Sequence, residues 1–192
     1  SILYNNGFSP FIKNSCLDLA KKITENITEK VVSSREDFRR TPTFTIDPEN
    51  AKDFDDALSV YKIKSDLFQI GVHIADVSHY VKKDDAIDKE ALKRGTSVYL
   101  SNRVVPMLPE ELSNNICSLR PGVDRLAFSV IFLITSNAEI IDYKIKKTVI
   151  HSNYRFTYEE AQNVINSKRG EFYTELSLLN SLAKKLRASR VK

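Results

Sequence analysis

The chain has 192 residues and a mass of 21.9 kDa, with 42% hydrophobic and 28% charged residues. This composition is that of an ordinary globular protein and excludes a disordered, collagenous or coiled-coil chain, while the length predicts one domain, or one domain and a piece of another. The net charge of +4 is the sum of +2 over residues 1–46, −5 over residues 47–92 and +7 over residues 93–192. A polyanionic partner therefore fits only if cations neutralise the acidic stretch over residues 47–92.

The first part of the chain is predicted to be helical and the next part to form strands. Ser9-Pro10 is expected to start a helix over residues 10–24, and a second short helix is expected over residues 28–39, where Thr41-Pro42 ends it. β-Branched and alternating patterns then predict strands over residues 43–46, 57–63 and 67–75, the last two as a hairpin that turns at residues 64–66.

The second half continues with alternating helices and strands. The predicted elements are a helix over residues 85–94, a proline-punctuated connection over 103–109, a strand over 126–135, its antiparallel return over 140–150, a helix over 157–165 and a longer helix from 171 onward. The strand over 126–135 is apolar on both faces, as in the centre of a sheet, and Thr157 with Glu160 forms a capping box. These elements predict an α+β fold with a mixed, mainly antiparallel sheet flanked by helices.

The apolar stretches, the cysteines and the two ends of the sequence bear on where the protein is expected to be found. The longest apolar stretch, Leu126 to Thr135, is shorter than the ~18 residues of a membrane helix, so no membrane association is expected. Two distant cysteines, Cys16 and Cys117, predict no disulfide partner and a reducing compartment, the cytoplasm. The start lacks a signal peptide and an initiator Met, and the last helix ends in a basic run, as expected of a fragment of a larger protein.

The strongest chemical signal is a set of four carboxylates within ten positions, directly after a predicted strand: Asp47, Asp53, Asp55 and Asp56. We call these the four aspartates, and residues 47–56 the acidic loop. Carboxylates that converge repel one another unless a multivalent cation lies between them, and oxygen-only ligands favour Mg²⁺ or Mn²⁺ over zinc. Pro48 is expected to turn the chain, and Phe54 to anchor the loop in the core.

Other metal sites fit less well. Counting an EF-hand loop from Asp53 places Leu58 where glycine is required and Lys64 where the bidentate glutamate is required, although an acidic solvated turn stays possible. His73 and His79 lack the spacing of a zinc site and are expected to be structural. Arg120 and Arg125 are equally compatible with phosphate contacts and with capping of the sheet.

The acidic loop is the first of several motifs that occur in a fixed order. They are Thr45-Ile-Asp-Pro-Glu-Asn-Ala-Lys-Asp-Phe-Asp-Asp-Ala-Leu58, Gly71-Val-His-Ile-Ala-Asp-Val-Ser-His-Tyr-Val81, Thr96-Ser-Val-Tyr-Leu100, Pro106-Met-Leu-Pro109, Leu112-Ser113, Cys117-Ser-Leu-Arg120 and Arg125-Leu-Ala-Phe-Ser-Val130. Together they resemble the ribonuclease II / ribonuclease R (RNB) family of exoribonucleases over residues 35–190, and the ribonuclease R branch most.

The resemblance implies a function and a set of roles. The four aspartates would be the catalytic residues that hold Mg²⁺, which Mn²⁺ can replace, for two-metal hydrolysis of single-stranded RNA from its 3′ end, processively, to nucleoside 5′-monophosphates. Asp55 is expected to be the most sensitive to substitution. Tyr99 and Tyr158 would contact RNA, although either alone reads as a core or sheet-face aromatic; stacking contributes ~1–3 kcal/mol per base.

The resemblance also implies an incomplete catalytic domain. Residues 1–40 would be a helical lead-in and residues 41–192 the N-terminal half of the catalytic domain. The other half, which supplies an Arg and a Glu, and the flanking RNA-binding domains would lie elsewhere in a monomeric parent protein, so the isolated chain is expected to be weakly active or inactive. A non-catalytic RNA-binding or regulatory half-domain, disfavoured by the intact four aspartates, and a structural Ca²⁺ module are the alternatives.

Overall fold

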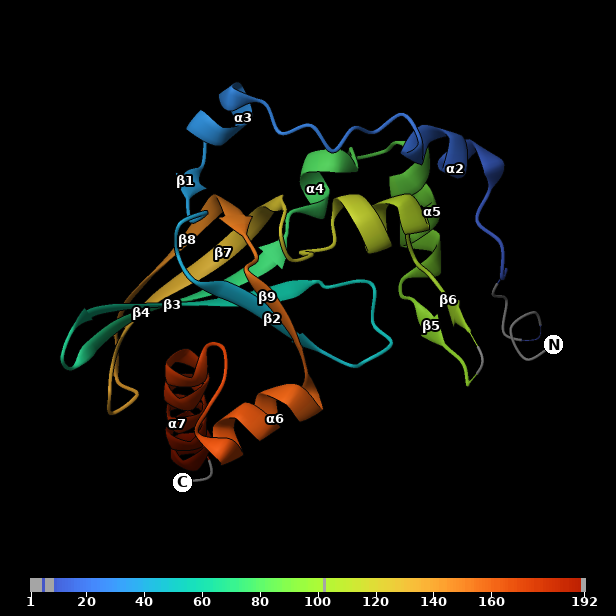
Figure 1. The fold of residues 1–192 in the computed structure, drawn as a ribbon. Helices are drawn as coiled ribbons and strands as arrows, with labels where there is room; N and C mark the ends of the chain where they lie inside the picture. The colour runs from blue at the N-terminus through green and yellow to red at the C-terminus, as the bar shows by residue number, and fades with distance from the viewer. Residues whose placement is uncertain (1–4, 6–8, 102, 191–192) are drawn as a thin grey trace.

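The computed structural model describes residues 5, 9–101 and 103–190. A seven-stranded sheet is formed by β1 (Glu36–Asp37), β2 (Thr43–Asp47), β3 (Asp56–Lys64), β4 (Leu67–Ala75), β7 (Asp124–Thr135), β8 (Ile140–His151) and β9 (Tyr154–Thr157). Its order is β1-β8-β7-β4-β3-β2-β9; the edge pairs β1–β8 and β2–β9 are parallel and the others antiparallel (Figure 1). The expected mixed, mainly antiparallel sheet of an α+β fold is confirmed. A separate ribbon pairs β5 (Val98–Tyr99) with β6 (Val104–Val105).

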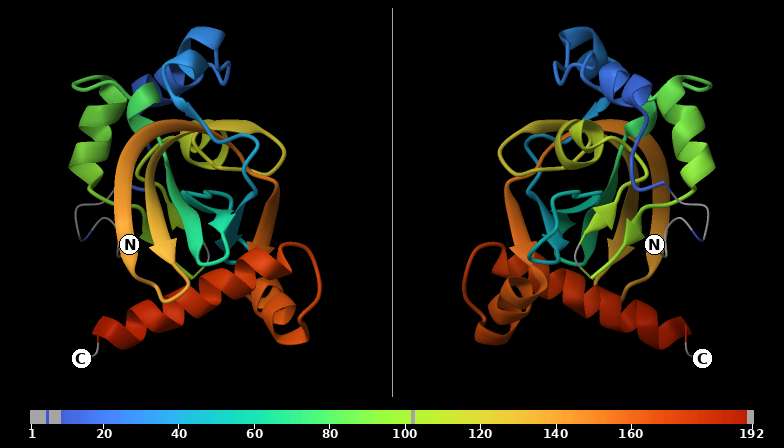
Figure 2. Two further views of the ribbon diagram at one scale, coloured as in Figure 1. Left: turned by 90° about the vertical axis from the view of Figure 1, so that its left-hand side faces the viewer. Right: turned by 90° about the vertical axis from the view of Figure 1, so that its right-hand side faces the viewer.

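Helices flank this sheet on two sides. They are α2 (Asn14–Ala20), α3 (Glu29–Ser33), α4 (Val77–Tyr80), α5 (Ala86–Arg94), the π-helix η1 (Glu111–Ile116), α6 (Tyr158–Ser167) and α7 (Tyr173–Arg190). Helices α2 to α5 gather on one side of the curved sheet, whereas α6 and α7 lie on the opposite side, with α7 crossing it (Figures 1 and 2). None of the helices in the described part of the chain is long and apolar enough to span a bilayer.

Elements with local sequence signals form as predicted. The hairpin β3–β4, the strand pair β7–β8 and the helix α5 all overlap the predicted ranges, and β7 lies inside the sheet between β4 and β8. The predicted capping box starts α6: the amide of Glu160 donates to Thr157 Oγ1 (3.0 Å), and the amide of Thr157 donates to Glu160 Oε2 (2.8 Å). One face of β7 is less covered than its apolar sequence implies, since Phe128 is 45% exposed.

The two N-terminal helices are shorter than predicted. The helix expected over residues 10–24 covers only α2, because Ser9 Oγ accepts the amide of Phe11 in a local turn instead of capping a helix (3.3 Å). The helix expected over residues 28–39 ends with α3, and residues 36–37 pair with β8 as β1. The reason is tertiary: the amide of Phe38 donates to the carbonyl of Val149 (2.8 Å), and the Phe38 ring is buried in the core.

The main core lies between the sheet and helices α2, α4, α5 and η1, and two smaller clusters lie under α6 and α7. Ala57, Ala75 and Ala127 line the sheet face of the main core, and Phe54 inserts into it from the acidic loop. The loop that carries the four aspartates is therefore anchored to the largest apolar cluster of the described residues.

A chain of buried hydrogen bonds crosses four strands on the face of the sheet that carries this core. His73 on β4 is fully buried, and its two ring nitrogens contact Ser59 Oγ (2.8 Å) and Ser129 Oγ (2.7 Å). Ser129 Oγ in turn contacts Thr148 Oγ1 on β8 (2.6 Å). Because both ring nitrogens are satisfied inside the sheet, the structural interpretation of His73 is confirmed.

Candidate active site

The acidic loop connects two neighbouring antiparallel strands. Asp47 is the last residue of β2 and Asp56 the first of β3, while Asp53 and Asp55 lie on the loop between them. Pro48 turns the chain as predicted, because its carbonyl accepts the amide of Ala51 (3.0 Å).

The predicted apolar anchor of the loop is also confirmed. Phe54 is only 9% exposed, and it fixes the positions of the two aspartates beside it. Its amide donates to Ser118 Oγ (3.0 Å), and its carbonyl accepts the amide of Leu119 (2.8 Å). The part of the loop next to Asp53 and Asp55 is thus held by both packing and backbone hydrogen bonds.

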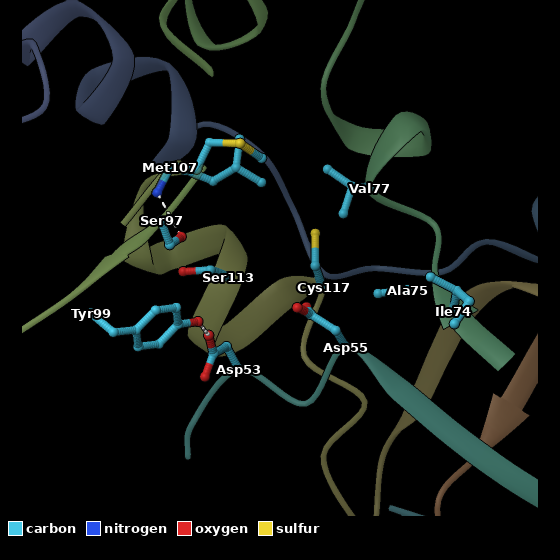
Figure 3. Close-up of a pocket in the computed structure, with 11 residues that line it drawn as sticks. Asp53, Asp55, Ile74, Ala75, Val77, Ser97, Tyr99, Met107, Ser113 and Cys117 are labelled. Carbon is cyan, nitrogen blue, oxygen red and sulfur yellow. Dashed lines mark hydrogen bonds between the residues drawn. The ribbon is translucent and has the colours of Figure 1, made fainter. Parts of the chain in front are cut away.

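The structure brings the four aspartates to one hollow. All four line a cavity of about 410 Å³ together with Tyr99. A second cavity of about 280 Å³ is also lined by Asp53, Asp55 and Tyr99, together with residues that include Ser97, Ser113 and Cys117. Figure 3 shows the side chain of Tyr99 pointing toward Asp53, and its hydroxyl donates to Asp53 Oδ2 (3.3 Å).

The two tyrosines occupy different places. Tyr99 is 68% exposed at the edge of both cavities, so its ring is accessible from solvent. Tyr158 begins α6, directly after Thr157, which pairs with Asp47 across β2 and β9. Tyr158 is 57% exposed and is not among the residues that line either cavity.

The electrostatics of the hollow favour a cation. Burial raises the pKa of Asp55, and the charges of the other three aspartates raise it further. Burial likewise raises the pKa of Asp47; the nearby Thr45 hydroxyl opposes the rise, the charge of Asp56 adds to it, and the charge of Arg155 opposes it more weakly than Thr45 does. Mutual repulsion of this kind is relieved when a positive ion enters the hollow.

The donor set fits a hard divalent cation. Asp47 Oδ2 is buried, and no described residue donates a hydrogen bond to it. Carboxylate oxygens are the ligands that Mg²⁺ and Mn²⁺ prefer. Across residues 5, 9–101 and 103–190, no three His, Cys, Asp or Glu side chains converge closely enough to hold an ion.

The histidine and arginine side chains near the loop have structural contacts. His79 Nδ1 lies 3.4 Å from Arg35 Nη2, which forms a buried ion pair with Asp76 (2.6 Å). Arg125 is buried and donates to the carbonyl of Ser118 (2.9 Å), so it supports the segment that holds the acidic loop. Arg120 is half-exposed, with its guanidinium 3.9 Å from Glu25.

Two residues at the site were not expected from the sequence. Ser118 Oγ donates to the carbonyl of Lys52 (2.8 Å), and Arg155 Nη2 donates to the carbonyl of Pro48 (2.6 Å). Ser118 lies within one of the motifs, which gave it no role, and Arg155 lies on β9, a strand that was not predicted. Neither contact has a local sequence signal, because each joins residues more than sixty positions apart.

Comparisons with known proteins agree with the motifs. The RNB domain model matches residues 35–192. Ribonuclease R of Mycoplasmopsis pulmonis is 49% identical over 152 residues, which are 79% of this chain and 21% of that protein. Human exosome complex exonuclease RRP44 is 43% identical over 184 residues, 95% of this chain and 19% of that protein.

A solved structure has the same fold. The structure of Mycoplasma genitalium RNase R in complex with ribose-methylated single-stranded RNA matches with a TM-score of 0.91 and 31% identity, over 98% of this chain and 30% of that one. The chain thus spans about a fifth of the length of the curated relatives it matches. The resemblance inferred from the motifs is confirmed, and the chain belongs to the RNB domain family.

Proposed function

We propose that this chain supplies part of the active site of a 3′-to-5′ exoribonuclease, which hydrolyses single-stranded RNA processively to nucleoside 5′-monophosphates. Residues 41–192 would be the N-terminal half of the catalytic domain and residues 1–40 its lead-in. The observation that carries the proposal is that the four aspartates and Tyr99 line one cavity in a chain of the RNB family.

The substrate proposal rests on chemistry and on the relatives. A single-stranded RNA end offers a phosphodiester and unstacked bases, and the exposed ring of Tyr99 beside the aspartates gives a base a surface for stacking. The exposed Tyr158 would contact RNA further from the aspartates. The similar ribonuclease R structure contains single-stranded RNA, which supports the same substrate class here.

The residues of this chain would have distinct tasks. The four aspartates would hold two Mg²⁺ or Mn²⁺ ions. The bound metal would neutralise and polarise the scissile phosphate. Tyr99 would orient the terminal base over the cavity. Phe54 and Ser118 would keep Asp53 and Asp55 in place. We further propose that the parent protein is a cytoplasmic monomer.

Substitution of Asp55 tests the catalytic assignment. Cleavage of a 3′-tailed RNA by the parent protein is measured with Mg²⁺ or Mn²⁺, for the wild type and Asp55→Asn, alongside RNA binding. We expect cleavage to fall by more than ~100-fold with binding retained, because loss of even an outer-shell partner costs 10–100-fold in metal affinity or activity. Undiminished cleavage would show that the aspartate assignment is wrong.

Measurements of cleavage, RNA binding and Ca²⁺ binding together test the alternative functions and the activity of the isolated chain. RNA binding without metal and without cleavage by the parent protein would favour a non-catalytic RNA-binding module. Tight Ca²⁺ binding without RNA affinity would favour the structural module. The 192-residue chain alone is expected to cleave weakly or not at all, and turnover equal to that of the parent protein would contradict this expectation.

A further inference from the structure

The acidic loop has little structure of its own. Residues 48–55 belong to no helix or strand, and the one backbone hydrogen bond within this described segment closes the turn from Pro48 to Ala51. Four like charges on so short a segment push it toward extended, separated conformations. The shape that brings the four aspartates to one cavity must therefore be imposed by residues outside the loop.

Arg155 contacts the loop at both ends. Strand β9 pairs with β2 so that Arg155 lies opposite Thr45, two residues before Asp47. From there Nη2 donates to the carbonyls of Pro48 (2.6 Å) and Glu49 (2.9 Å), and the guanidinium carbon lies 5.6 Å from the centroid of the Phe54 ring. A planar, permanently charged fork suits such a combined contact better than an ammonium group does.

Ser118 holds the loop from the other side. Its hydroxyl donates to the carbonyl of Lys52 and accepts the amide of Phe54, and the side chain is fully buried. Ser118 contributes geometry only, because it is neutral, whereas Arg155 adds a positive charge that acts on Asp47. Both residues contact Phe54, but of the two only Arg155 binds the carbonyls of Pro48 and Glu49, so that part of the loop depends on Arg155.

We propose that Arg155 is a positioning residue of the site: it holds the first half of the acidic loop so that the four aspartates face one cavity, and it thereby sets the affinity for a divalent cation. This inference rests on the proposed function, in which the four aspartates hold the metal. Arg155 has no contact with RNA in this inference. Substitution of Arg155 would therefore change the affinity for the metal and the mobility of the loop.

Two measurements on the 192-residue chain test this role. The first is Mn²⁺ affinity, from the electron paramagnetic resonance signal of free Mn²⁺ at constant ionic strength. The second is hydrogen exchange of the amides of residues 49–54. The variants are Arg155→Met, which removes the fork and the charge, and Arg155→Lys, which keeps the charge. Arg169→Met is the matched control, because Arg169 is exposed between α6 and α7.

We expect Arg155→Met to weaken Mn²⁺ binding by about 10–100-fold, the usual effect of losing a partner that orients metal ligands. Exchange at residues 49–54 should become faster in the same variant. Arg155→Lys should weaken binding by a smaller factor, and Arg169→Met should change neither quantity. If urea denaturation shows that Arg155→Met is not folded, the same two measurements on Arg155→Lys test the inference instead.

The outcomes separate the inference from the proposed function. Wild-type affinity and wild-type exchange in Arg155→Met would overturn the inference and leave the metal site in place. A wild-type chain that binds no Mn²⁺ would count against the proposed metal site, and exchange at residues 49–54 would still decide whether Arg155 holds the loop. Equal effects from Arg155→Met and Arg169→Met would also refute the specific role of Arg155.

Discussion

Stability should fall as the pH drops below neutrality, because His73 must stay uncharged in the folded chain. Burial lowers its pKa from 6.5 to about 4, and its ring nitrogens contact the hydroxyls of Ser59 and Ser129. The Phe38 ring packs edge-on at 5.4 Å. A proton that the unfolded chain binds near pH 6.5 is therefore excluded from the native chain until about pH 4.

The size and sign of the effect follow from linkage. Between pH 6.5 and 4 the unfolded state binds more protons than the native state, so the free energy of unfolding falls as the pH is lowered. The full difference in pKa corresponds to about 3 kcal/mol at 1.36 kcal/mol per unit, and about 2 kcal/mol of it is lost between pH 7 and pH 5. The raised pKa values of Asp47 and Asp55 act in the opposite direction over part of this range.

A His73→Gln variant isolates the histidine, since the aspartates are common to both proteins. Urea denaturation at several pH values between 4.5 and 7.5 gives the free energy of unfolding of each. We expect the advantage of the wild type to shrink by about 2 kcal/mol from pH 7 to pH 5. Parallel pH profiles, or a His73 ring that nuclear magnetic resonance shows to be charged at pH 5.5, would refute the reasoning.

Substitutions at three further residues have defined outcomes. Asp76→Asn should cost about 3–5 kcal/mol in urea denaturation, because it leaves the buried charge of Arg35 uncompensated, and a loss below ~1 kcal/mol would contradict this. Thr157→Ala should cost about 1 kcal/mol by removing the cap that accepts the amide of Glu160, and unchanged stability would show that the cap is dispensable. In the parent protein Tyr99→Ala should weaken RNA binding by ~1–3 kcal/mol and Tyr99→Phe should not, as measured by fluorescence anisotropy; equal losses would exclude stacking as the contribution.

Elements whose form is set by residues close together in the sequence could be predicted from the sequence. The β3–β4 hairpin follows from two β-like runs with a polar turn, and the start of α6 follows from the Thr157–Glu160 capping box. The end of α3 could not be predicted in this way. Residues 36–37 have no strong strand pattern, and they become a strand because β8 offers a free edge.

The candidate site likewise has a part that local sequence predicts and a part that depends on tertiary contacts. The density of the four aspartates and the apolar Phe54 among them were enough to locate the acidic loop and to predict its anchor. The contacts of Ser118 and Arg155 with that loop depend on tertiary pairing and have no local signal. The chemistry of the site is thus visible in one short segment, whereas its support is distributed along the chain.

The parallel pairing of β2 with β9 has a consequence for protein synthesis. Arg155 is made 107 residues after Pro48, the residue whose carbonyl it holds. At the usual ~5–20 residues per second, a ribosome needs roughly 5–20 s to make that stretch. During this interval the nascent chain carries its acidic loop without the strand that fixes its first half. The loop can reach its final shape only after β9 has emerged, so a ribosome that stalls before residue 155 would display a complete set of aspartates in an unassembled site.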